Sequence, residues 1–222
     1  MKLKVCGMKN VENIKSIGDL KPDYMGFIFY ERSKRNFEGI IPELPKSIKK
    51  TGVFVNEYIE IIVSLVEEYK LEAIQLHGDE SVEYVQQLKE GLRQAELDSV
   101  SHKKALRQAQ NDIEIIKVFG IKDDFDFGVL KPYENEVDYF LFDTKGKERG
   151  GNGTKFDWSV LKKYSYSKPF FLGGGIGPND AKEIKRIQNS GLPIYAVDIN
   201  SKFENNPGLK NNKEVKNFRN QL

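Results

Sequence analysis

The chain has 222 residues, and its 35 lysines and arginines nearly balance its 33 aspartates and glutamates, which leaves a formal net charge of +2. This balance excludes the electrostatic field that selects nucleic acid or an anionic membrane, and the single cysteine excludes an internal disulfide. No apolar run reaches the roughly 18 to 20 residues that span a bilayer and the N-terminus lacks a signal peptide's apolar region, so we expect a cytoplasmic protein without a nucleic-acid or membrane partner.

Segments typical of strands and of helices alternate along the whole chain. Apolar or aromatic runs of strand length recur, and most are followed by a segment with apolar residues at helical spacing. The expected strands are 3–6, 24–30, 52–56, 72–77, 113–119, 139–142, 169–173 and 194–199. The expected helices are 11–20, 42–50, 58–69, 81–92, 123–135, 157–164, 179–188 and 212–222, of which the fifth is weak because it contains a proline.

Eight β-then-α units in a chain of this length predict an α/β protein with a closed (β/α)8 TIM barrel rather than an open doubly wound sheet. We expect a single domain over residues 1–222, because no linker or low-complexity tract interrupts the pattern. Residues 93–111 are polar, rich in Gln, Lys and Ala, and lack a sustained apolar stripe. This segment is interpreted as a helical extension or a surface insertion.

Residues 137–158, VDYFLFDTKGKERGGNGTKFDW, change character at Asp143. An aromatic run precedes it, and a polar loop with four glycines follows, so a carboxylate ends a buried strand. Catalytic acids and bases of parallel α/β enzymes lie at such strand ends. The structural alternative is that Asp143 only caps the loop.

Polar residues near the ends of four predicted strands share one face when side chains are assigned alternately to the two faces. Unsatisfied polar groups inside a barrel cost about 1 to 3 kcal/mol each, so their clustering favours a site. The residues are Lys4, Cys6, Gln75, His77, Asp143 and Asp198. The structural alternatives are that the free cysteine is a small buried hydrophobic residue and that the histidine is a core imidazole. No third ligand has suitable spacing for a metal ion, so we expect no bound metal.

Glycines follow the seventh predicted strand in the segment 173–179, GGGIGPN, and the polar segment 200–204 follows the eighth. In such barrels these two loops present backbone N–H groups to a phosphate, and glycine permits close approach. Neither a P-loop nor a dinucleotide fingerprint is present. The sequence therefore predicts a small phosphorylated ligand, with a tight turn as the structural alternative.

The motifs LKVCGMK, GFIFYERSKR, TGVFVN, IQLHGDE, FLFDTKGKERGGNGTKFDW, FLGGGI and VDINSKFENNPGLK occur in an order that resembles the phosphoribosylanthranilate isomerases of tryptophan biosynthesis. The resemblance covers nearly the whole chain outside residues 90–111. It implies a cofactor-independent Amadori rearrangement of N-(5-phosphoribosyl)anthranilate to 1-(2-carboxyphenylamino)-1-deoxyribulose 5-phosphate. It also leaves open whether the protein is a monomer or a homodimer.

The resemblance implies a role for particular residues. Asp143 would be the general acid and Cys6 the general base, although a free aspartic acid is ionised and a free cysteine mostly protonated at neutral pH. A planar guanidinium suits the anthranilate carboxylate. The residues that would bind substrate are Arg35 at this carboxylate, Gln75 and His77 along the site wall, and Gly174, Gly175, Asn200 and Ser201 at the phosphate.

Two positions depart from the family pattern. Gly173 replaces an alanine, which adds only flexibility, and Lys202 replaces a glycine, which puts the conformation of the phosphate loop in question because a Cβ disfavours positive φ.

Three alternative functions exist for a barrel of this kind. The histidine-pathway aminoaldose isomerase resembles a duplicated half-barrel, and this chain shows no internal repeat. Indole-glycerol-phosphate synthase would need catalytic lysines on inner strand faces. A non-catalytic sugar-phosphate-binding barrel would have no reason to hold Cys6 and Asp143 at facing strand ends.

Overall fold

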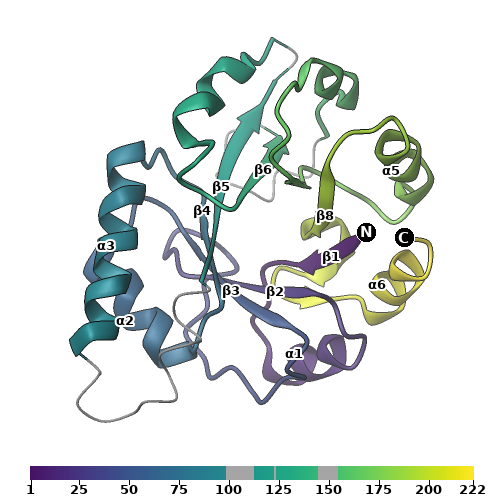
Figure 1. The fold of residues 1–222 in the computed structure, drawn as a ribbon. Helices are drawn as coiled ribbons and strands as arrows, with labels where there is room; N and C mark the ends of the chain where they lie inside the picture. The colour runs from purple at the N-terminus through teal and green to yellow at the C-terminus, as the bar shows by residue number, and fades with distance from the viewer. Residues whose placement is uncertain (99–112, 123, 145–154) are drawn as a thin grey trace.

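The structure is a computed structural model that describes residues 1–98, 113–122, 124–144 and 155–222. Within these residues eight parallel strands close into a barrel, each hydrogen-bonded to the next in sequence and the last to the first (Figure 1). The expected (β/α)8 barrel is therefore confirmed. Its strands are β1 (Lys2–Val5), β2 (Tyr24–Ile28), β3 (Lys49–Phe54), β4 (Ala73–Leu76), β5 (Glu114–Ile121), β6 (Tyr139–Thr144), β7 (Phe170–Leu172) and β8 (Ile194–Ile199).

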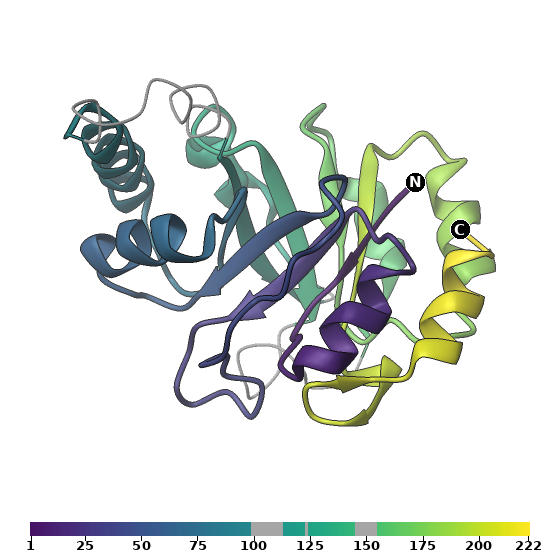
Figure 2. The ribbon, with the colours of Figure 1, turned by 90° about the horizontal axis from the view of Figure 1, so that it is seen from below.

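Helical segments cover the outside of the barrel. In Figures 1 and 2, α2 and α3 lie side by side on one flank, and α5 and α6 lie on the opposite flank. None of the described helices is long and apolar enough to cross a membrane. The helices are α1 (Val11–Gly18), α2 (Ile59–Tyr69), α3 (Val82–Asp98), η2 (Phe127–Tyr133), η3 (Trp158–Lys163), α5 (Ala181–Gln188), η4 (Ser201–Phe203) and α6 (Asn212–Arg219), where η marks a 3₁₀ helix.

The helix predicted over residues 42–50 is wrong. Pro42 and Pro45 interrupt the segment, only a single turn closes there between Pro45 and Ile48, and β3 already begins at Lys49. A proline removes a backbone donor and disfavours helical geometry in the residue before it. The apolar residues of this segment therefore pack as irregular chain between β2 and β3.

Other elements differ from expectation in type or extent. The helices predicted over 123–135 and 157–164 are the 3₁₀ helices η2 and η3, and the first contains Pro132. A short hairpin after β8, formed by β9 (Glu204–Asn206) and β10 (Leu209–Lys210), was not predicted. Helix α3 runs on to Asp98, but most of the predicted extension over 93–111 lies outside the described residues. That extension and the single-domain organisation stay predictions.

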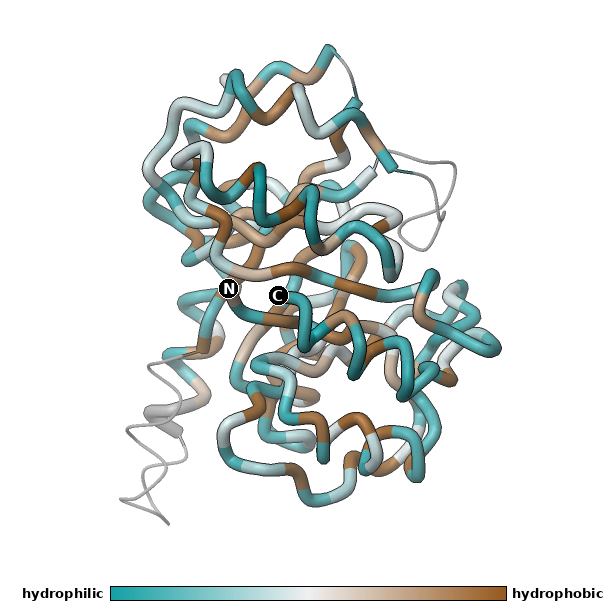
Figure 3. The backbone as a smooth tube through the Cα atoms, turned by 90° about the vertical axis from the view of Figure 1, so that its right-hand side faces the viewer, coloured by the Kyte–Doolittle hydropathy of each residue, from teal (hydrophilic) through white to brown (hydrophobic). Residues whose placement is uncertain are grey.

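Apolar side chains form one cluster inside the barrel and a larger one between the strands and the helices. In Figure 3 the helical coils alternate between teal and brown, as helices with one apolar face should. The interior cluster consists of Tyr24, Ala73, Ile116, Val118, Leu141, Phe171 and Ala196. These side chains fill the barrel below its polar C-terminal end, so the barrel is a packed core and not a channel.

The N-terminal end of the barrel is closed by hydrogen-bonded tyrosines. The Tyr24 hydroxyl donates to Glu114 at 2.8 Å, and Lys49 reaches the other oxygen of Glu114 at 2.7 Å. The ammonium of Lys2 donates to the Tyr195 hydroxyl at 2.6 Å. Charged and phenolic groups thus satisfy one another at this end, as partly buried polar groups must.

Closure of the barrel joins the two ends of the sequence. Lys4 of β1 lies opposite Asp198 of β8, and the Cys6 backbone N–H donates to the carbonyl of Ile199 at 2.9 Å. Figures 1, 2 and 3 all show the N- and C-termini close together beside these strands. Residue 6 therefore meets the segment that follows β8.

Candidate active site

The polar residues predicted to share a face do meet at the C-terminal end of the barrel. Cys6 directly follows β1, His77 directly follows β4, Asp143 is the penultimate residue of β6, and Asn200 directly follows β8. Parallel strands end at one side of the sheet, so the loops beyond them enclose a single region. The alternation of side chains in the sequence was sufficient to predict this grouping.

Cys6 is a free thiol, 4% exposed, beside the ion pair of Lys4 and Asp198. The Lys4 ammonium lies 2.9 Å from Asp198 Oδ1, and the lysine side chain is completely buried. Burial raises the pKa of the Cys6 thiol; the Lys4 and Lys210 ammonium groups oppose that rise, and Asp198 adds to it. Burial also raises the pKa of Asp198, against the pull of Lys4. The charges of two lysines therefore counteract part of the rise in the Cys6 pKa that burial causes.

Asp143 is held between its own strand and His77. Its Oδ1 accepts the Thr144 backbone N–H at 2.7 Å, and its Oδ2 lies 3.3 Å from His77 Nε2. The Gln75 amide nitrogen lies 3.3 Å from His77 Nδ1, so a donating amide there places the ring proton on Nε2, facing Asp143. The buried Gln75 Oε1 has no hydrogen-bond partner among the described residues, which leaves an acceptor at the site wall.

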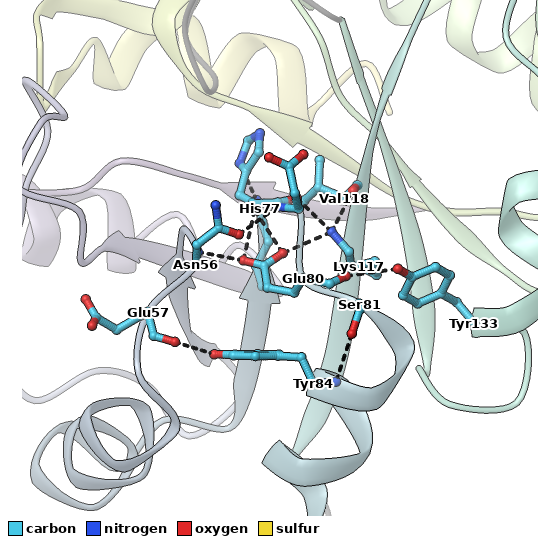
Figure 4. Close-up of polar contacts among 12 residues, drawn as sticks. Asn56, Glu57, His77, Glu80, Ser81, Tyr84, Lys117, Val118 and Tyr133 are labelled. Carbon is cyan, nitrogen blue, oxygen red and sulfur yellow. Dashed lines mark hydrogen bonds and ion pairs between the residues drawn. The ribbon is translucent and has the colours of Figure 1, made fainter.

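The loop after β4, which carries His77, is anchored by a buried carboxylate. Figure 4 shows Glu80 facing Lys117, with His77 beside them. Glu80 accepts the Gly78 N–H on both oxygens at 3.0 Å, the Asn56 N–H at 2.9 Å and the Lys117 ammonium at 3.0 Å. The side chains of Glu80 and Lys117 are 1% and 4% exposed. One carboxylate thus fixes the chain that positions His77.

Arg35 does not stand alone as a solvated charge. Its Nε and Nη2 donate to both oxygens of Glu204, with 2.7 Å between Nη2 and Oε2. Glu204 Oε1 also accepts the Lys210 ammonium at 2.6 Å. Burial would raise the pKa of Glu204, but the hydrogen bonds from Arg35 and the charge of Lys210 bring it below its ordinary value. The loop after β2 is thereby tied to the β9–β10 hairpin beside Cys6.

The two loops predicted to bind phosphate lie next to each other in the barrel order. Gly174 and Gly175 have φ values of 81° and 65°, and a Cβ on Gly174 would lie 2.5 Å from the Thr144 backbone nitrogen. Ser201 opens the 3₁₀ helix η4. Lys202 lies inside η4 and is not among the described residues with positive φ, so the lysine in place of glycine causes no backbone strain there.

Three charged residues near the site were missed from sequence. Glu80, Lys117 and Lys210 are buried in the structure. Glu80 and Lys210 occur in polar stretches of the sequence, whereas Lys117 lies within the apolar strand β5. In the sequence Lys210 follows Pro207 and Gly208, and the only hint of burial is Glu204, its ion-pair partner in the structure, six residues earlier. Among the described residues no group of three or more His, Cys, Asp or Glu side chains could hold a metal ion.

Comparisons with known proteins give the family. A family model for N-(5'-phosphoribosyl)anthranilate (PRA) isomerase matches residues 3–111 and 94–221. An N-(5'-phosphoribosyl)anthranilate isomerase of Parabacteroides distasonis is 40% identical over 229 residues, which cover 100% of this chain and 93% of the relative. The chain belongs to this family. It is therefore an aldose-ketose isomerase of tryptophan biosynthesis.

Solved structures of phosphoribosylanthranilate isomerases have the same fold. One, in complex with reduced 1-(o-carboxyphenylamino)-1-deoxyribulose 5-phosphate, superposes with a TM-score of 0.70 at 27% identity, covering 98% of this chain and 96% of that one. Another is a monomer generated from the dimeric enzyme of Thermotoga maritima, with a TM-score of 0.68 at 26% identity, covering 100% and 97%. One isomerase of this family thus binds a reduced 5-phosphate compound, and the enzyme of Thermotoga maritima is dimeric.

Proposed function

We propose that the chain converts N-(5-phosphoribosyl)anthranilate to 1-(2-carboxyphenylamino)-1-deoxyribulose 5-phosphate with Asp143 as general acid and Cys6 as general base. The observation that carries these roles is the placement of a free thiol with two neighbouring cations after β1 and of a carboxyl group held by His77 on β6 at one end of one barrel. No cofactor is required, because the rearrangement only moves protons and an electron pair within the substrate.

The first step opens the ribose ring. Asp143 gives a proton to the ring oxygen, the bond between C1 and that oxygen breaks, and the lone pair of the anthranilate nitrogen forms a C1=N iminium. His77 fixes the direction of the Asp143 carboxyl group, and the loop anchored by Glu80 fixes His77. A correctly aimed acid supplies its catalysis only within hydrogen-bond reach of the ring oxygen.

The second step removes the proton at C2. The Cys6 thiolate takes that proton, the C2–H electrons form a C1=C2 bond, and the iminium nitrogen becomes a neutral amine. The resulting enol then becomes the ketone as C1 gains a proton and the C2 hydroxyl loses one. The whole sequence is redox-neutral, and Asp143 and Cys6 finish with exchanged protonation states.

The substrate would lie with its two anionic ends on different loops. The ion pair of Arg35 with Glu204 uses Nε and Nη2, so Nη1 would be the donor to the anthranilate carboxylate. Backbone N–H groups of Gly174, Gly175, Asn200 and Ser201 would receive the phosphate, and Gln75 Oε1 would accept a sugar hydroxyl. We further infer a cytoplasmic protein that is a monomer or, like its Thermotoga relative, a homodimer.

Replacement of Cys6 tests the base. Cys6→Ala should lower kcat by about 10²- to 10⁴-fold, the usual size of general-base catalysis, while the circular dichroism spectrum stays native. Turnover is followed by fluorescence on mixing the protein with freshly prepared phosphoribosylanthranilate. Cys6→Ser, which keeps the size but not the acidity of the thiol, is the matched control and should be nearly as slow. Full activity in the folded alanine variant would contradict the assignment.

A further inference from the structure

We propose that Lys210 is an electrostatic positioning residue that stabilises the thiolate of Cys6. This inference rests on the proposed function only for its catalytic consequence, since the ionisation of the thiol is measurable without turnover. Lys210 lies at the end of β10, which is not a barrel strand, and no role was expected for it from the sequence.

Hydrogen bonds hold both the ammonium and the backbone of Lys210 in place. Its ammonium donates to Asn200 Oδ1 at 2.7 Å and to Glu204 Oε1 at 2.6 Å, and the side chain is 0% exposed. Its backbone is clamped by the buried Asn13, which accepts the Lys210 N–H at 2.7 Å and donates to the Lys210 carbonyl at 3.0 Å. These contacts fix both the backbone and the side chain of Lys210 in the interior of the protein.

Asn200 connects the ammonium to the end of β1. A Cβ added to Gly7 would lie 2.7 Å from Asn200 Oδ1, the same oxygen that accepts from Lys210. Gly7 has a φ of 73°, so the chain turns directly after Cys6 and allows this approach. The Asn200 oxygen that accepts from the Lys210 ammonium therefore also packs closely against Gly7, the residue after Cys6.

Of the two described lysines that act on Cys6, Lys210 has the less neutralised charge. The described groups that act on the thiol are Lys4, Asp198 and Lys210. Lys4 has Asp198 as its own carboxylate, whereas Lys210 and Arg35 share the single carboxylate of Glu204. The second cluster thus holds two cations and one anion, and a thiolate at Cys6 would supply the missing negative charge.

The protonation behaviour of Lys210 agrees with this geometry. Burial lowers the pKa of Lys210 to about 8 although Glu204 acts in the opposite direction. A nearby thiolate would stabilise the protonated form of this buried amine, and the ammonium would stabilise the thiolate by the same free energy. The two groups should therefore titrate as a coupled pair with shared apparent pKa values.

The test uses the fact that Cys6 is the only cysteine. Protein grown with Cβ-¹³C cysteine gives one resonance, whose chemical shift against pH reports the ionisation of this thiol. In Lys210→Met and in Lys210→Gln, which retains hydrogen bonding but not charge, the midpoint should move up by about one pH unit or more. Lys210→Arg, which retains the charge, should restore the midpoint to near its wild-type value.

Lys117→Met is the matched control, because Lys117 is also a buried lysine paired with a glutamate at this end of the barrel. It should leave the Cys6 midpoint unchanged. An unchanged midpoint in either folded neutral variant of Lys210, or an equal shift in Lys117→Met, would overturn the proposal. At neutral pH the neutral variants should also lose about tenfold or more in kcat/KM and regain it as pH rises, which a purely structural role would not produce.

The two proposals can fail separately. If Cys6→Ala is fully active but the midpoint still shifts in the Lys210 variants, the electrostatic role stands and the general base is another group. If Cys6→Ala is inactive and the midpoint does not shift, Cys6 remains the base and Lys210 only holds the hairpin in place.

Discussion

Cys6 lies where burial and charge act in opposite directions. Burial raises the pKa of its thiol, and Lys4 and Lys210 counteract that effect from β1 and from the β9–β10 hairpin. A base with a high pKa is strong but rarely deprotonated, whereas a base with a low pKa is available but weak, so catalysis is best near the working pH. The buried lysines shift Cys6 toward that compromise without opening the site to water.

Asp143 is the residue to test for the acid. Asp143→Asn keeps the size of the side chain and removes its exchangeable carboxyl proton, so kcat should fall by about 10²- to 10⁴-fold while KM changes little. Steady-state kinetics with a circular dichroism control measures this. Asp198→Asn is the comparison on β8, which β7 separates from β6. If Asp198→Asn loses activity and Asp143→Asn retains it, the acid belongs to β8.

At the scale of elements, the loops at the C-terminal end are fixed by charges buried beneath them. Glu80 ties the loop after β4 to Asn56 after β3 and to Lys117 of β5. Glu204 ties the loop after β2 to the hairpin after β8. Loops that carry catalytic groups need such supports, because a misplacement of about 1 Å can cost about a hundredfold in rate.

Removing one partner of the Glu80 ion pair should affect both stability and rate. Glu80→Gln leaves the Lys117 ammonium buried without its carboxylate, which costs about 3 to 5 kcal/mol of unfolding free energy in comparable pairs. The kcat should fall as well, because His77 loses its anchored loop. Urea titration and steady-state kinetics measure the two effects.

The control is Glu90→Gln, the same substitution in the exposed pair of Glu90 with Arg93. It should change the unfolding free energy by less than about 1 kcal/mol and leave kcat unaltered. Equal destabilisation by the two substitutions would show that the Glu80 pair contributes nothing beyond an ordinary surface contact.

The sequence predicts the barrel well because its strands are short apolar runs with a regular helical partner, and strand parity places Cys6, His77 and Asp143 together. It does not predict the chain around Pro45, where the apolar residues resemble a helix but prolines prevent one. It also misses Lys210 and Glu80. Whether a lysine or glutamate is buried depends on partners that are distant in the sequence, and local composition does not reveal those contacts.

At the scale of the whole molecule, one end of the barrel is structural and the other carries the candidate site. The N-terminal end is closed by the network of Tyr24, Glu114 and Lys49, whereas the C-terminal end carries the candidate catalytic groups. The packed interior cluster lies between them. Substitutions that stabilise the tyrosine network should therefore leave the chemistry untouched, since distant sites without shared contacts behave additively.

Barrel closure should also make the Cys6 thiol a reporter of global unfolding. A bulky maleimide reacts slowly with a sulfur that is 4% exposed, and the reaction should become much faster once β1 separates from β8. The urea concentration at which labelling becomes fast should therefore coincide with the loss of the circular dichroism signal. Labelling well below that concentration would show that the β1–β8 seam opens on its own.

Because β1 pairs with β8, the site can form only late in the synthesis of the chain. Cys6 leaves the ribosome roughly 200 residues before Lys210, an interval of roughly 10 to 40 s at ordinary rates of synthesis. Until then β1 has no β8 to pair with, and the thiol has no Lys210 ammonium beside it. A chain that stops short of the last unit should consequently contain every strand from β1 to β7 and still lack the environment in which its cysteine can act.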